Sequence, residues 1–119
     1  MKARQTKSAL IIGASGLVGK LLLEAILQKD YYISITLVLR RSIDLKYDKR
    51  VKIITISDFD ALDQYEEDLF SEDVFCCLGS TMKKAGSKSA FEKSDFIYPL
   101  KVATINQKNP NFKNYLIVT

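Results

Sequence analysis

Short apolar runs recur along the chain, and each one ends near a glycine, a charge or a polar residue. They lie at residues 8–14 (SALIIGA), 34–40 (SITLVLR), 50–56 (RVKIITI), 73–79 (DVFCCLG) and 114–119 (NYLIVT). Runs of this length that are rich in β-branched residues predict strands. The almost wholly apolar ones are typical of strands that are buried on both faces of a parallel sheet.

Amphipathic stretches with helical spacing separate these runs. From Leu17 onward, polar residues recur every four positions at Lys20, Glu24 and Gln28, with apolar residues between them. This pattern predicts a helix with a narrow polar stripe and a broad buried face.

Two further helices are expected later in the chain. Residues 58–70 place Leu62, Tyr65 and Leu69 on one face and carry acidic residues early, as helix N-termini do. Residues 94–107 have a helical pattern in which Pro99 fits only near the first turn or at a kink.

The alternation of strands and helices predicts an α/β fold. We expect one domain over residues 1–119, a three-layer Rossmann-type structure with a doubly wound parallel sheet covered by helices on both faces. Right-handed crossovers would give its roughly five strands the order 3-2-1-4-5.

Composition supports this picture and excludes several classes of function. Hydrophobic residues make up 47% of the 119 residues and charged residues 27%, and the net charge of +4 is too small to imply nucleic-acid binding. The first apolar run is interrupted by Gly13, which makes it too short for a signal peptide, and no window approaches a membrane span. We therefore predict a cytoplasmic protein that binds neither nucleic acid nor membrane, with Cys76 and Cys77 as buried reduced thiols.

Three of the five glycines fall within seven positions, between the first strand and the first helix. Glycine tolerates unusual backbone angles and allows close approach, and a helix start offers unpaired N–H groups to a phosphate. We predict that Gly13 makes the turn, Gly16 lets a pyrophosphate approach and Gly19 lets the helix pack on the sheet. The spacing differs from the common G-x-G-x-x-G fingerprint, so a tight turn without a ligand is the alternative.

The end of the second strand bears on which nucleotide is bound. NAD-binding units carry an acidic residue there, which holds the ribose 2′-hydroxyl. This chain has Arg40 and Arg41 instead, and guanidinium groups suit a 2′-phosphate. We therefore predict that NADP(H) is preferred over NAD(H), the alternative being a solvated strand end.

Two more strand ends should face the same cleft, because ligands bind at the carboxyl ends of parallel strands. Asp58 and Phe59 are expected near the adenine, although Asp58 would serve equally as a helix cap. Leu78, Gly79 and Ser80 are expected against the nicotinamide ribose, although Gly79 also suits an ordinary turn.

The stretches GASGLVG, LVLRR and DVFCCLGSTMKKAGSKSAFEKSDFIYPLKVA resemble the atypical short-chain dehydrogenase/reductases, most closely the TIP30-like (HTATIP2-like) oxidoreductases. The segment FCCLGSTMKKAG is the most specific part, and the resemblance extends over essentially the whole chain. It implies NADP(H) binding through Gly13, Ser15, Gly16, Leu17, Val18, Gly19, Arg40, Arg41, Leu78 and Gly79.

The chain departs from that family in its catalytic residues. Members carry a serine after the fifth strand and then a Tyr-x-x-x-Lys pair, whereas no tyrosine here has a lysine four positions later. We therefore expect an N-terminal half that is inactive alone, with no catalytic residue, no metal site and Tyr98 serving in packing.

The resulting prediction is the NADP(H)-binding portion of an oxidoreductase that, at full length, transfers hydride to an unknown small carbonyl substrate. The alternatives are a non-catalytic NADP(H)-sensing module for a protein partner and a fragment too incomplete to bind anything well. The last strand (114–119) would be an uncovered apolar edge, which favours a homodimer.

Overall fold

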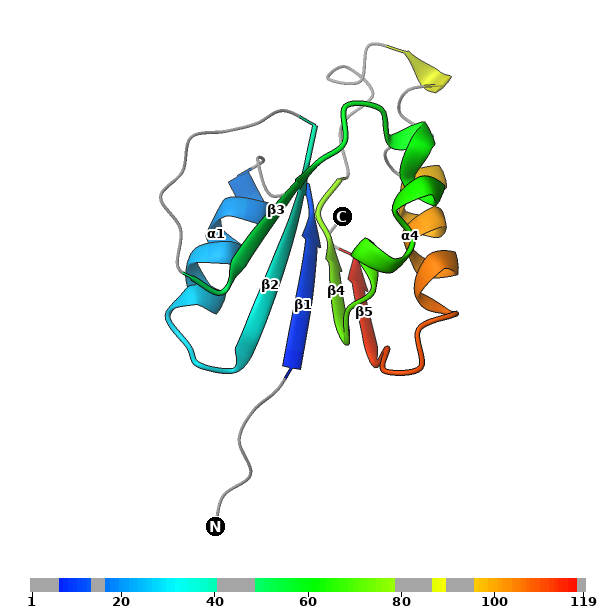
Figure 1. Cartoon of the computed structure of the whole chain (residues 1–119). Coiled ribbons are helices and arrows are strands. Elements are labelled where there is room, and N and C mark those ends of the chain that lie inside the picture. Colours follow the sequence, from blue (N-terminus) through cyan, green and yellow to red (C-terminus); the bar gives the residue numbers. More distant parts are fainter. Residues whose placement is uncertain (1–6, 14–16, 41–48, 79–86, 90–95, 118–119) are drawn as a thin grey trace.

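Five parallel strands form the centre of the computed structural model, which describes residues 7–13, 17–40, 49–78, 87–89 and 96–117 (Figure 1). The strands are β1 (Lys7–Ile12), β2 (Tyr32–Leu39), β3 (Val51–Thr55), β4 (Asp73–Cys76) and β5 (Asn114–Ile117). Their order in the sheet is β3-β2-β1-β4-β5, and every pairing is parallel. The predicted fold and strand order are confirmed.

Helices cover both faces of the sheet (Figure 1). Helix α1 (Leu17–Leu27) packs on one face, whereas the 3₁₀ helices η1 (Phe59–Tyr65) and η2 (Glu67–Leu69) and helix α4 (Tyr98–Asn106) lie on the other. Pro99 lies in the first turn of α4, as predicted. Among the described residues, no helix has the length and apolar character needed to cross a membrane.

Strand β1 shows why its sequence is apolar on both sides. Leu10 and Ile12 point into the core beneath α4 and η1, whereas Ala9 and Ile11 point into the core beneath α1. All four side chains are fully buried. Because successive residues of a strand face opposite ways, a central strand between two helical layers needs an unbroken apolar run.

The segment 58–70 is helical but not α-helical, which corrects the sequence prediction. Ala61 N–H donates to Asp58 O at 3.0 Å, an i to i+3 bond that marks a 3₁₀ helix. The packing explains this geometry: buried Phe59 and Leu62 and partly buried Tyr65 recur every three residues and pack against the core. A helix with three residues per turn places them on one line.

Helix α1 is buried along a narrower face than predicted. Only Gly19, Leu23 and Ile26 are buried, whereas Leu21 is largely exposed. One helix resting on one sheet covers only the stripe that faces the sheet, so apolar residues on its flanks stay outside the core.

At the amino ends of the strands, four strands are joined by one carboxylate. Asp73 of β4 accepts hydrogen bonds from the Tyr32 hydroxyl of β2 (2.7 Å) and the Asn114 amide of β5 (2.8 Å). Lys7 of β1 forms an ion pair with it at 3.4 Å. Burial alone would raise the pKa of Asp73, but the hydrogen bonds and the lysine charge outweigh burial and lower it. The hydrogen bond from Tyr32 to Asp73 holds the first residue of β2 in the sheet. Strand β2 therefore starts two residues earlier than predicted.

We expect Asp73→Asn to lower the free energy of unfolding by about 2–3 kcal/mol at neutral pH, because charge-assisted bonds on a buried group are lost. Since the folded pKa lies below the unfolded value of about 3.9, this stabilisation is complete above that pH and is lost as pH falls through the folded pKa. Urea denaturation between pH 2 and 7 measures both effects. An Asp73→Asn variant with the same acid dependence as the parent would contradict this assignment.

Candidate functional site

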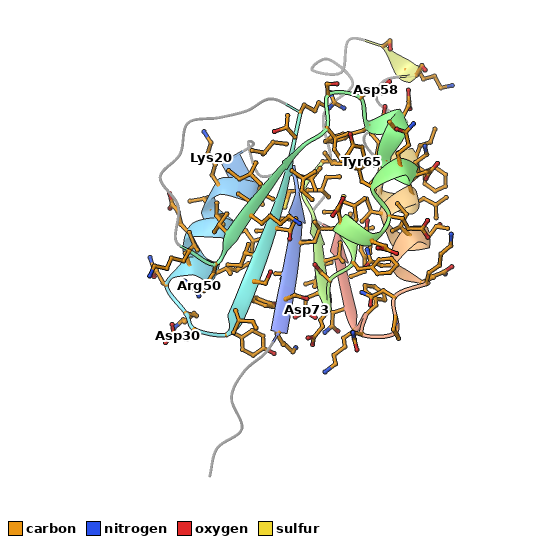
Figure 2. All side chains as sticks on the ribbon, viewed as in Figure 1. Lys20, Asp30, Arg50, Asp58, Tyr65 and Asp73 are labelled. Carbon is orange, nitrogen blue, oxygen red and sulfur yellow. The ribbon has the colours of Figure 1, made fainter. Side chains whose placement is uncertain are left out.

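The candidate site lies at the carboxyl ends of the strands, where the predicted cofactor-binding residues gather. Figure 2 places Asp58 at this end of the sheet and Asp73 at the opposite end. The starts of α1 and η1 lie at this same end of the sheet (Figure 1). The predicted residues Ser15, Gly16, Arg41, Gly79 and Ser80 lie outside the described residues, so their places remain predictions.

Gly13 follows β1 directly and has a φ of +90°, a conformation that residues with a Cβ rarely adopt. A Cβ at this position would lie 2.7 Å from both the carbonyl carbon and the oxygen of Cys77. The two strands approach closely here because Cys77 N–H donates to Ile12 O at 2.8 Å. Only glycine fits, as expected of the residue that makes the turn.

The first turn of α1 presents apolar side chains and no carboxylate. Leu17 is 76% exposed and Val18 is also exposed, whereas Gly19 is buried, in agreement with its predicted packing role. The positive end of the α1 dipole therefore has no carboxylate from the first turn of α1 beside it. The exposed side chains of Leu17 and Val18 border this start of the helix.

Arg40 follows the last residue of β2 and is exposed. Its guanidinium carbon lies 4.7 Å from the centroid of the Phe59 ring and 6.0 Å from that of Tyr98. The structure places Arg40 at the end of the second strand, with its guanidinium over aromatic rings. Its contact with a nucleotide stays a prediction. No pattern in the sequence joins residues 40, 59 and 98; the topology brings them together.

The segment after β3 is occupied by internal contacts. The Asp58 carboxylate accepts from Asp60 N–H at 2.9 Å and caps η1, which is the alternative that the sequence left open. Phe59 is only 2% exposed and belongs to the core, with its ring edge-on to that of Tyr98. An adenine contact for Asp58 or Phe59 stays a prediction.

The end of β4 and the two described residues after it place Cys76, Cys77 and Leu78 beside the core. Leu78 is half-buried and packs against the core, and Cys76 and Cys77 are free thiols. Burial raises the pKa of both cysteines, which keeps them protonated at neutral pH and weak as nucleophiles. Cys76 is buried as predicted, whereas Cys77 is only half-buried.

The tyrosines near the cleft have partners that suit packing rather than proton transfer. The Tyr98 hydroxyl donates to the Asp60 carboxylate at 3.1 Å, and the Tyr115 hydroxyl donates to Pro99 O at 2.6 Å. Burial raises the pKa of Tyr115, which makes it a poorer acid than a free tyrosine. The expectation that Tyr98 packs is confirmed by its burial among the core residues.

Comparison with known proteins agrees with this geometry. The sequence pattern of the NAD dependent epimerase/dehydratase family matches residues 9–118. Protein HTATIP2 of Rattus norvegicus is 39% identical over 103 residues, which are 85% of this chain and 42% of that protein. The chain thus spans less than half the length of this curated relative.

Solved structures share the fold at low sequence identity. The enzyme WbmF of Bordetella bronchiseptica in complex with NAD+ matches with a TM-score of 0.74 and 16% identity, over 96% of this chain and 36% of that one. A short chain dehydrogenase of Leptospira borgpetersenii with bound NAD+ gives 0.68 and 15%, over 87% and 46%.

We expect Gly13→Ala to lower the free energy of unfolding by at least about 1–3 kcal/mol, because it forces a side chain into a strained backbone region and against the Cys77 backbone. Thr55→Ala, at an exposed position at the end of β3, is the control for a substitution that meets no close neighbour. Urea denaturation of both variants measures the difference, and equal losses would contradict the close approach.

Proposed function

The chain belongs to the NAD dependent epimerase/dehydratase family, and on that premise we propose that it is the NADP(H)-binding portion of a short-chain dehydrogenase/reductase-like oxidoreductase. In the full-length protein, the bound nucleotide would exchange hydride with a small carbonyl substrate. The exposed guanidinium of Arg40 at the end of β2 is the observation that carries the proposal.

The diphosphate would lie at the turn from β1 into α1. Any side chain at Gly13 would collide with the Cys77 backbone, so residue 13 has none. The carboxyl end of the sheet therefore presents main chain without a side chain beside the start of a helix. WbmF and the Leptospira borgpetersenii dehydrogenase share this fold and hold NAD+. We propose the same class of ligand for this chain, held also by Ser15 and Gly16.

The preference for NADP(H) would come from Arg40 and Arg41. An arginine gives a 2′-phosphate paired donors, whereas a ribose 2′-hydroxyl needs an acceptor, which neither arginine supplies. Leu78, Gly79 and Ser80 would line the nicotinamide ribose, where a neutral, close backbone suits a sugar. Leu17 and Val18 would border the diphosphate with apolar surface.

The chemistry of this portion would be binding and orientation. The 119 residues contain no histidine and no tyrosine with a lysine four positions later. The tyrosines described near the cleft are bound to Asp60 and to Pro99 O. The groups that exchange a proton with the substrate would therefore come from another part of the protein.

The second candidate function is a sensor that binds NADP(H) and reports it to a protein partner without turnover. A sensor needs no Tyr-x-x-x-Lys pair, and these 119 residues contain none. A gene sequence that continues into such a pair would favour the enzyme, and a continuation without it would favour the sensor. In either case, the free cysteines suit a reducing cytoplasm.

We expect the chain to bind NADPH at least about tenfold more tightly than NADH, since a paired charge-assisted interaction is worth about 1.5–3 kcal/mol. Arg40→Gln and Arg41→Gln should each reduce this ratio and leave NADH affinity within about twofold, because NADH lacks the phosphate that they contact. Isothermal titration calorimetry with both nucleotides measures the ratio. Equal, weak responses to NADPH and NADH would defeat the NADP(H) assignment.

We also propose that the edge of β5 pairs with a second copy of the chain. Strand β5 pairs with β4 on one side, and Leu116 and Ile117 are 47% and 53% exposed. Unpaired backbone groups beside exposed apolar side chains invite another strand.

Light scattering at rising protein concentration should show a dimer, and Leu116→Lys should shift the chain toward monomer because a charge on the edge opposes pairing. Lys52→Gln, on the opposite edge strand β3, serves as the control for a general change of charge. A single monomeric species at high concentration would contradict edge pairing.

A further inference from the structure

The guanidinium of Arg40 rests on an aromatic pair supplied by two other segments. Phe59 comes from the start of η1 and Tyr98 from the start of α4, and both rings lie within cation–π distance of Arg40. Three segments that are distant in sequence therefore meet at the carboxyl end of β2. An arginine on a surface usually samples many rotamers. Contact with the two rings restricts the rotamers of Arg40.

The aromatic pair is itself held in place. Phe59 and Tyr98 are both buried, with ring centroids 5.6 Å apart and ring planes at 84° to each other. The Tyr98 hydroxyl donates to the Asp60 carboxylate, and Asp60 N–H is capped by Asp58. Edge-to-face packing and these two hydrogen bonds fix the surface on which the guanidinium lies.

The carboxylates of Asp58 and Asp60 hydrogen-bond to groups other than Arg40. Within the part of the chain that the structure describes, no carboxylate forms an ion pair with Arg40, and the carboxylates of Asp58 and Asp60 bind Asp60 N–H and the Tyr98 hydroxyl. Rings bind a guanidinium without accepting its in-plane N–H groups. The donors of Arg40 therefore remain available to an anion.

We propose that Phe59 and Tyr98 are positioning residues that hold Arg40 ready for the 2′-phosphate and thereby set the preference for NADP(H) over NAD(H). This inference rests on the proposed function. Immobilising a long side chain costs about 0.5–1.5 kcal/mol on binding, and a side chain already fixed by a stack avoids most of that cost. A nucleotide without the 2′-phosphate gains nothing from a pre-positioned Arg40. The rings therefore raise the affinity for NADP(H) relative to that for NAD(H).

The test is the ratio of dissociation constants for ligands that differ only by the 2′-phosphate: NADPH against NADH, and adenosine 2′,5′-bisphosphate against 5′-AMP. Phe59→Leu keeps an apolar side chain and removes the ring, and we expect it to lower both ratios about twofold to tenfold. A lost contact between the ring and the adenine would weaken NADPH and NADH alike and would leave their ratio unchanged. Tyr98→Phe keeps the ring, removes the bond to Asp60 and should lower the ratios less.

Lys101→Met is the matched control. Lys101 lies one turn along α4, donates to Asp60 O and pairs with Asp63, and it makes no contact with Arg40 among the interactions of the described residues. The ratios should therefore stay at the parent value, whereas a general weakening of the η1–α4 contact would change Kd for all ligands alike.

Two results separate this inference from the proposed function. If Arg40→Gln abolishes the preference while Phe59→Leu leaves it intact, positioning is overturned and the NADP(H) assignment stands. If the parent chain shows no preference for the 2′-phosphate, both are overturned. Should Phe59→Leu not fold, nitrogen relaxation of the Arg40 side chain in the parent protein decides: an order parameter below about 0.6 describes a flexible group and would overturn the inference.

Discussion

The close approach of β1 and β4 at Gly13 is the constraint on which the rest of the site depends. The backbone of Cys77 lies where a Cβ of residue 13 would be, and the bond from Cys77 N–H to Ile12 O fixes that separation. The chain must then leave the sheet with a positive φ before α1 begins. One glycine therefore sets the direction in which the chain leaves the sheet toward α1.

The architecture was predictable from the sequence because it depends on features that recur along it. Apolar runs such as residues 8–14 identify strands buried on both faces, and the handedness of crossovers then limits the sheet to few orders. Gly13 and Gly19 could be given their tasks because a strand ends and a helix starts around them. Arg40 could be placed at the carboxyl end of the sheet because it directly follows an apolar strand and parallel strands present their carboxyl ends together.

The remaining features depend on contacts between distant residues, which local patterns do not encode. The 3₁₀ geometry of η1 follows from the need to bury Phe59 and Leu62 on one line, and helical spacing in the sequence does not reveal it. The exposed flank of α1 depends on how much sheet lies beneath it. The seat of Arg40 on Phe59 and Tyr98 and the bond between Tyr32 and Asp73 join residues tens of positions apart.

The Asp73 cluster ties four strands together at the end of the sheet opposite to Asp58 (Figure 2). Strand alignment is therefore secured without help from the residues that would meet a ligand. This separation makes the scaffold evolvable. Substitutions at the carboxyl end of the sheet can change which ligand would bind there without altering the register of the strands.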